Sequence, residues 1–242
     1  MSRLYWRLRE IDPVVSALSR ARRRWLLARL RVVALWYRGE VDVSISPSAR
    51  LGRRLRVVVA PGSRSTLVVG DKAIIGDDVR MVLEGGRAVI GARADLRRLI
   101  TLVVGGTLEV GDQVVLQTGC SLHCADSLRI GRRTGVGEFT TVVDSSHHYT
   151  SPEEWFVDNV HTSPVVIGAD CWIGAKVTIG RGVTVGDYAV IGANSLVTRP
   201  VPMGHLVVGV PAEVVRPVRL PWRDLEGPEP TGATGPGGRA PA

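Results

Sequence analysis

Branched apolar residues recur at every sixth position over residues 167–197 of this 242-residue chain. A small or branched residue stands four positions after each of them, and a glycine directly follows the first five. Neither a period of 2 nor a period of 3.6 fits this pattern. A six-residue repeat instead predicts one flat side of a triangular coil, with its lead residue pointing inward. The lead residues are Ile167, Ile173, Ile179, Val185, Ile191 and Val197.

Weaker copies of the repeat precede this block, in registers that shift by two or three residues. Each shift indicates a small insertion at a turn. Because one coil can bury its interior only against its neighbours, the repeats predict a continuous stacked core. The upstream lead residues are Ile45, Leu51, Val57, Val69, Ile75, Met81, Ile90, Leu96, Val104, Val110, Leu116, Leu122, Ile130, Val136 and Val142.

Composition agrees with many short strands joined by tight turns. The chain has 28 glycines but only two phenylalanines and four tyrosines, which suits stacked branched residues with glycine at the corners. We therefore expect an N-terminal segment over 1–40, an all-β hexapeptide-repeat β-helix over 41–218 and a disordered tail over 219–242. The tail is rich in proline and glycine and has few apolar groups to bury.

The net charge of +8 belongs to one terminal segment. Residues 1–38 contain ten arginines against Glu10 and Asp12, and the remaining chain is neutral. No nucleic-acid surface is therefore expected on the folded body. The segment predicts one or two basic amphipathic helices, broken near Pro13. Two interpretations stay open: a cap on the open end of the β-helix, or peripheral contact of residues 1–38 with an anionic membrane.

No N-terminal stretch has the uninterrupted apolar core of a signal peptide, so a cytoplasmic location is expected. No stretch of the N-terminal segment approaches the roughly 20 apolar residues that span a bilayer.

The regular repeats stop at Val142 and resume at Pro164. The stretch over 143–163 is too long for a turn, and a long loop leaving a regular scaffold often carries function. It contains Trp155 and Phe156, which need a surface to cover, such as a neighbouring subunit. Its other chemically versatile residues are Asp144, His147, His148, Tyr149, Glu153, Glu154, Asp158, Asn159 and His161.

Residues 45–218 resemble the left-handed β-helix acyltransferases of the hexapeptide-repeat type. Pro164–Gly174 looks like the segment that re-enters the helix after the active-site loop of sugar O-acetyltransferases, and Ala193–Arg199 with Gly209–Ala212 looks like their C-terminal signature. The resemblance implies a left-handed coil and a homotrimer. It also implies transfer of an acetyl or other acyl group from acyl-CoA to a hydroxyl of a sugar or glycan precursor.

In the resembled enzymes the catalytic histidine stands five residues after the last lead residue before the loop. Counting from Val142 selects His147 as the general base, and a histidine can accept a proton near neutrality. Asp144 is expected to begin the turn, with orientation of the imidazole as the alternative. His123, just after a lead residue, is the second choice for contact with the acceptor.

The resemblance also implies that coenzyme A lies along a groove between two subunits, with Arg216 near the nucleotide phosphates. Two positions depart from the family pattern. Residue 175 is alanine where a hydroxyl often helps to hold the oxyanion, so backbone N–H groups would take that role. Glu213 stands where a basic residue is common. The implied donor site consists of Trp172, Gly174, Ala175, Ala193, Thr198, Arg199 and Arg216.

A metal site at Cys120, His123 and Cys124 is not expected, because Cys120 occupies an inward slot and no second cluster completes four ligands. Two other function classes stay open. A trimeric metal enzyme of the carbonic-anhydrase-like β-helix group needs converging histidines, and the pair separated by four residues expected there is missing from this sequence. A non-catalytic β-helix scaffold would bind no coenzyme A.

Overall fold

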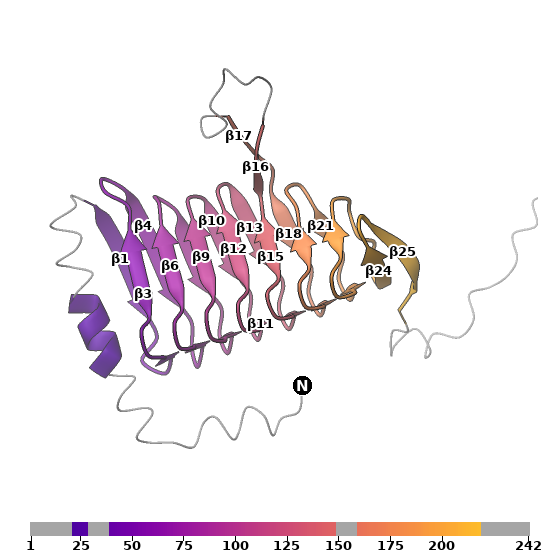
Figure 1. Cartoon of the computed structure of the whole chain (residues 1–242). Helices are drawn as coiled ribbons and strands as arrows, with labels where there is room; N and C mark the ends of the chain where they lie inside the picture. Colours follow the sequence, from indigo (N-terminus) through magenta and orange to yellow (C-terminus); the bar gives the residue numbers. More distant parts are fainter. Residues whose placement is uncertain (1–20, 29–38, 149–158, 219–242) are drawn as a thin grey trace, which may run out of the picture.

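The computed structural model describes residues 21–28, 39–148 and 159–218. These residues form a parallel β-solenoid with one short helix at its N-terminal end (Figure 1). The predicted hexapeptide-repeat β-helix is thereby confirmed.

Three sheets form the sides of the solenoid, and each of the first seven coils contributes one strand to each sheet. Two further strands, paired antiparallel, extend the second sheet at the C-terminal end. Sheet 1 contains β1 (Glu40–Ile45), β4 (Arg64–Val69), β7 (Arg87–Ile90), β10 (Thr107–Val110), β13 (Ser127–Ile130), β18 (Val165–Ile167) and β21 (Thr184–Val185). Sheet 2 contains β2 (Arg50–Leu51), β5 (Ile74–Ile75), β8 (Asp95–Leu96), β11 (Val115–Leu116), β14 (Gly135–Val136), β19 (Trp172–Ile173), β22 (Val190–Ile191), β24 (His205–Gly209) and β25 (Ala212–Pro217). Sheet 3 contains β3 (Arg56–Val59), β6 (Arg80–Leu83), β9 (Thr101–Val104), β12 (Ser121–Cys124), β15 (Thr141–Val143), β20 (Thr178–Ile179) and β23 (Leu196–Val197).

The predicted lead residues line the interior. All of them are buried except Ile45, on the first strand, which is partly buried. One register differs from the prediction: Leu102, not Val104, is the partner of Leu122 in sheet 3. Val104 is also buried, because β9 is long enough to turn a second side chain inward. The core is thus a set of parallel stacks of branched side chains.

The three corners of the coil differ in length. The corners between sheets 1 and 2 and between sheets 2 and 3 keep the same spacing from coil to coil, whereas the extra residues of the upstream coils all fall where sheet 3 returns to sheet 1. Aspartates tie successive coils together at the first of these corners. The backbone N–H of Ala92 donates to Oδ1 of Asp112 at 2.7 Å, and that of Ala169 donates to Oδ1 of Asp187 at 2.7 Å.

The helix over residues 21–28 packs on the first coil. Leu26 is 3% exposed and belongs to the core cluster, and Nη1 of Arg22 donates to the backbone carbonyl of Leu51 at 3.0 Å. These contacts support the interpretation as a cap. No helix among the described residues is long and apolar enough to cross a membrane. Residues 1–20 and 29–38 of the N-terminal segment and the predicted tail over 219–242 lie outside the described residues.

Candidate active site

A two-stranded hairpin projects from the solenoid at the corner where sheet 3 returns to sheet 1 (Figure 1). It consists of β16 (Ser145–His147) and β17 (Val160–Thr162), paired antiparallel between β15 and β18. The predicted excursion over 143–163 therefore leaves the regular coils as expected. Residues 149–158, with Trp155 and Phe156, lie outside the described part of the chain.

Asp144 fixes the base of this hairpin. Its side chain is fully buried, and its two carboxylate oxygens accept hydrogen bonds at 2.8 Å from the backbone N–H groups of Ala125 and Asp126 in the preceding coil. Its own carbonyl accepts from the N–H of Ser163 at 2.8 Å, which closes the neck of the hairpin. These contacts favour the role of a turn anchor over that of an imidazole partner.

The hairpin register separates the two adjacent histidines. His147 pairs with Val160, and the backbone N–H of His148 donates to the carbonyl of Asn159 at 2.8 Å. Because neighbouring residues of a strand point to opposite faces, the two imidazoles project from opposite sides of the hairpin. Both residues are exposed.

The face that carries His148 also carries His161. Their ring centroids are 5.0 Å apart with an interplanar angle of 44°, and Nε2 of His161 is 3.2 Å from Oδ1 of Asn159. His148 is therefore engaged with a second histidine, whereas the face of His147 is shared with Ser145 and Thr162. The two histidines thus have different neighbours, and the choice of His147 as the base stays a prediction.

His123 lies near the hairpin, on the outer surface of sheet 3. It pairs in register with Val143, and its backbone carbonyl accepts from the N–H of Asp144 at 3.3 Å. Its Nε2 is 2.8 Å from the hydroxyl of Ser121. His123 is thus a neighbour of the hairpin base, in keeping with its expected place beside an acceptor.

Trp172 lies on the outer surface of sheet 2 and is 51% exposed. It pairs with Gly135 in the preceding coil, and a Cβ built on that glycine would lie 2.9 Å from Cε3 of the indole. The ring therefore rests on the backbone of Gly135, which has no side chain to displace it. A large, exposed and positioned aromatic surface results.

Gly174, Ala175 and Ala193 lie together at the corner between sheets 2 and 3, beside Trp172. A Cβ on Gly174 would lie 2.5 Å from the backbone nitrogen of Ala193, so only glycine permits this approach of successive coils. The N–H of Asn194 donates to the carbonyl of Ala175 at 2.9 Å. Four of the seven donor residues implied by the resemblance thus form one continuous strip.

The other three donor residues lie elsewhere. Thr198 and Arg199 follow β23 at the corner where the hairpin also leaves, and both are exposed. Arg216 is exposed on β25, at the end of sheet 2, and its Nη1 donates to the carbonyl of Pro217 at 3.2 Å. Within one chain, sheet 3 separates the strip at Trp172 from the corner that carries His147.

The three cysteines are buried and unoxidised, and burial raises the pKa of each thiol, to about 11 for Cys120 and Cys171 and to about 12 for Cys124. Cys124 is raised furthest because the carboxylate of Asp144 adds to the effect of burial. Among the described residues, no three His, Cys, Asp or Glu side chains are grouped so that they could hold a metal ion.

The corner between sheets 2 and 3 carries an exposed apolar ledge, which the hexad pattern did not predict. Phe139 is 57% exposed and Leu99 is 52% exposed at equivalent positions of this corner. A Cβ on Gly119, between them, would lie 2.4 Å from Cδ1 of Phe139. The signal was a bulky residue in a turn position of the hexad, where the side chain has to face outward.

Residues 164–199 match the family described as bacterial transferase hexapeptide (six repeats). The chain is 28% identical over 129 residues to a putative colanic acid biosynthesis acetyltransferase of Escherichia coli, covering 53% of this chain and 69% of that protein. It is 33% identical over 118 residues to a probable acetyltransferase of Mycobacterium tuberculosis, covering 48% of this chain and 39% of that protein.

The chain is also similar to solved structures. A hexapeptide-repeat acetyltransferase of Vibrio cholerae, solved with acetyl coenzyme A, is 23% identical, with coverage of 80% of this chain and 78% of that one and a TM-score of 0.39. An N-acyltransferase of Bacillus cereus, solved with a sugar nucleotide and coenzyme A, is 18% identical, with coverage of 77% and 88% and a TM-score of 0.48.

The stacked hexads and the projecting hairpin define a hexapeptide-repeat β-helix protein. The matching repeats over residues 164–199 and the named relatives make the chain similar to the hexapeptide-repeat acetyltransferases.

Proposed function

We propose that this protein moves an acetyl or other acyl group from acyl-CoA to a hydroxyl of a sugar or glycan precursor, with His147 as general base. The observation that carries the proposal is the hairpin, which holds His147 exposed and on the face opposite His148. Its base is fixed by the two hydrogen bonds that Asp144 accepts. A base has to be held within reach of the acceptor proton, and this anchor supplies that restraint.

The chemistry is direct transfer within a ternary complex. His147 takes the proton of the acceptor hydroxyl as its oxygen attacks the thioester carbon. The carbon–sulfur bond of the tetrahedral intermediate then breaks, and the imidazolium returns the proton to the leaving thiolate. General-base action of this kind contributes roughly 10²–10⁴ in rate. Because residue 175 is alanine, backbone N–H groups are proposed to stabilise the oxyanion.

The proposed donor site lies between two copies of the chain in a homotrimer. One copy would supply the corner with His147, Thr198 and Arg199, and its neighbour the strip at Trp172. Two observations support this arrangement: sheet 3 separates the two groups within one chain, and Phe139 and Leu99 expose an apolar ledge beside the strip. Arg216 and Arg199 would pair with the phosphates of coenzyme A, as guanidinium groups do readily.

Sugar acceptors are proposed because of the relatives. One is named as a putative lipopolysaccharide biosynthesis O-acetyl transferase of Escherichia coli, 28% identical over 119 residues that cover 46% of this chain and 61% of that protein. The cytoplasmic location stays a prediction. Contact of residues 1–38 with a membrane is also a proposal, and a glycan precursor carried on a lipid would make it useful.

The test compares His147→Ala with His148→Ala. Both remove one exposed imidazole from the same hairpin, so the second controls for damage to the fold. Release of free coenzyme A from acetyl-CoA is followed with a panel of soluble glycosides as acceptors. We expect His147→Ala to lose at least a hundredfold in kcat, in line with the size of general-base catalysis, and His148→Ala to stay within threefold. Equal turnover of both variants and wild type would remove His147 from the mechanism.

A further inference from the structure

A pocket lies between the N-terminal helix and the first coil, four coils away from the hairpin along sheet 3. Its volume is about 300 Å³. Part of its wall comes from the helix over 21–28 and part from the corner after β2. The lining residues are Arg22, Trp25, Leu26, Leu51, Gly52, Arg53, Arg54, Leu55 and Arg56.

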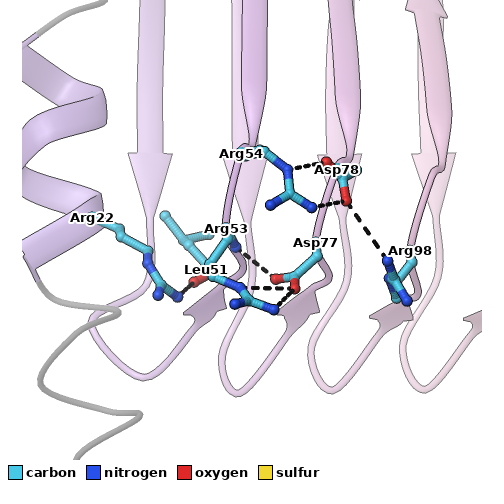
Figure 2. A network of polar contacts seen from close by, with 7 residues as sticks. All are labelled: Arg22, Leu51, Arg53, Arg54, Asp77, Asp78 and Arg98. Atoms are coloured by element: carbon cyan, nitrogen blue, oxygen red, sulfur yellow. Dashed lines mark hydrogen bonds and ion pairs between the residues drawn. The ribbon is translucent and has the colours of Figure 1, made fainter.

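The wall of the pocket carries an excess of positive charge (Figure 2). Asp77 binds Arg53 with an Nη2–Oδ2 distance of 2.9 Å, and Asp78 binds Arg54 through both oxygens. Arg98 also approaches Asp78, at 4.0 Å. These hydrogen bonds and charges hold the pKa of both carboxyls below its usual value, so both are ionised at neutral pH.

Two aspartates thus face three arginines (Figure 2). Arg22 and Arg56 add two further positive charges at the pocket. Arg22 uses Nη1 to hold the carbonyl of Leu51, which fixes its guanidinium at the pocket wall. The pocket wall is therefore cationic, and contacts hold three of its four arginines, Arg22, Arg53 and Arg54. Such a wall suits a phosphate group, to which a guanidinium can offer two parallel N–H donors.

The floor of the pocket is apolar. Leu26 and Leu51 are buried beneath it, and Leu55 is partly buried. Trp25, on the exposed side of the helix, is 61% exposed. A tryptophan beside arginines is the arrangement that proteins use at the boundary between lipid headgroups and hydrocarbon. A ligand that fits has both a phosphate and an apolar portion.

We propose that this pocket binds the headgroup of an anionic phospholipid and so seats the N-terminal end of the solenoid on a membrane surface. The phosphate lies against Arg22 and Arg56, and Trp25 enters the region of the acyl chains. The arginine-rich remainder of residues 1–38 adds a less specific attraction to the same surface. This inference is independent of the acyl-transfer chemistry.

The experiment measures sedimentation of the full chain with vesicles of phosphatidylglycerol and phosphatidylcholine, against pure phosphatidylcholine. Arg22→Gln/Arg56→Gln removes two charges at the pocket, and Arg23→Gln/Arg24→Gln removes two charges from the same helix outside it. A contact with an anionic headgroup is worth about fivefold per arginine, so we expect a loss of roughly thirtyfold for the first pair. The matched pair, which does not line the pocket, should lose less than the first pair.

Two further measurements test whether the pocket binds the lipid headgroup. Arg56→Gln alone, which leaves the Arg22 contact with the first coil intact, should still lose about fivefold. Inorganic phosphate at constant ionic strength should not displace the protein from vesicles. Equal losses for the two double variants would overturn the proposal, as would displacement by inorganic phosphate, which would indicate a site for a free anion. Failure of the wild type to bind anionic vesicles would overturn it as well.

Discussion

The anchor of the hairpin makes a quantitative prediction for Asp144→Asn. The side chain keeps its shape, but one carboxylate oxygen becomes an NH2 group, which cannot accept a hydrogen bond. One of the two backbone donors, Ala125 or Asp126, then loses its partner in a fully buried site. A hydrogen bond to a charged group contributes about 1.5–3 kcal/mol. We take about 2 kcal/mol, which corresponds to roughly thirtyfold in the equilibrium for local opening.

Hydrogen exchange of the amides at residues 125 and 126, followed by mass spectrometry, measures this opening directly. We expect both amides to exchange about thirtyfold faster in Asp144→Asn than in wild type. Turnover should fall as well, because displacing a catalytic group by about 1 Å can cost a hundredfold. The exchange result does not depend on the proposed chemistry, so it tests the anchor even where no acceptor is known.

Asp112→Asn is the matched control. Asp112 accepts one backbone N–H bond, from Ala92 at 2.7 Å. It lies at the exposed corner between sheets 1 and 2, whereas the hairpin leaves the corner between sheets 3 and 1. Loss of this hydrogen bond should lower the free energy of unfolding by less than about 1 kcal/mol, since water can replace the carboxylate as the partner of the Ala92 N–H. Turnover should stay unchanged. Unchanged exchange at residues 125 and 126 in Asp144→Asn would refute the assignment of Asp144 as the anchor.

Packing and charge lead to four more predictions. Gly135→Ala should displace the Trp172 ring, because the added Cβ would lie 2.9 Å from Cε3 of the indole. Since Trp172 belongs to the proposed donor site, we expect a several-fold higher KM for acyl-CoA with little change in kcat. Thr140→Val should destabilise the solenoid by about 1–3 kcal/mol in chemical denaturation, because its buried hydroxyl donates to Gly174 at 2.9 Å and accepts from Val177 at 3.2 Å. Thiol reagents at pH 8 should label the native protein only after unfolding, since burial raises the thiol pKa values. Native stability should fall as pH rises above about 9, where the unfolded thiols ionise and the folded ones stay protonated. The thiols are Cys120, Cys124 and Cys171.

The fold could be predicted because the hexad is a local pattern with a single geometric solution. The spacing of Ile167 and Ile173 already places both on the inside of successive sides, and no knowledge of distant contacts is needed. The error at Val104 arose where a longer strand turns two residues inward, so that Leu102 and Val104 are both buried. The period alone does not reveal strand length.

The candidate site was less accessible to sequence reasoning, because it depends on pairing between segments far apart in the chain. The faces to which the side chains of His147 and His148 point follow from the hairpin register, in which these residues lie opposite Val160 and Asn159. The capping contact of Leu26 could not be predicted from the sequence for a similar reason. A basic amphipathic helix can pack on a protein core or on a membrane. The burial of Leu26 against the first coil shows the capping contact, and the vesicle experiment tests whether the same helix also binds a membrane.

The unequal corners of the coil have a consequence for how this scaffold can change. Where sheet 3 returns to sheet 1, neighbouring coils already accommodate additions of two residues, three residues or a whole hairpin without losing the stacked interior. The other two corners hold their length, and their strands stay in step. New segments grafted at the permissive corner of any coil should therefore be tolerated, which makes this edge the place where members of such a lineage can acquire different acceptors. The same insertion at a fixed corner would throw every later strand out of register.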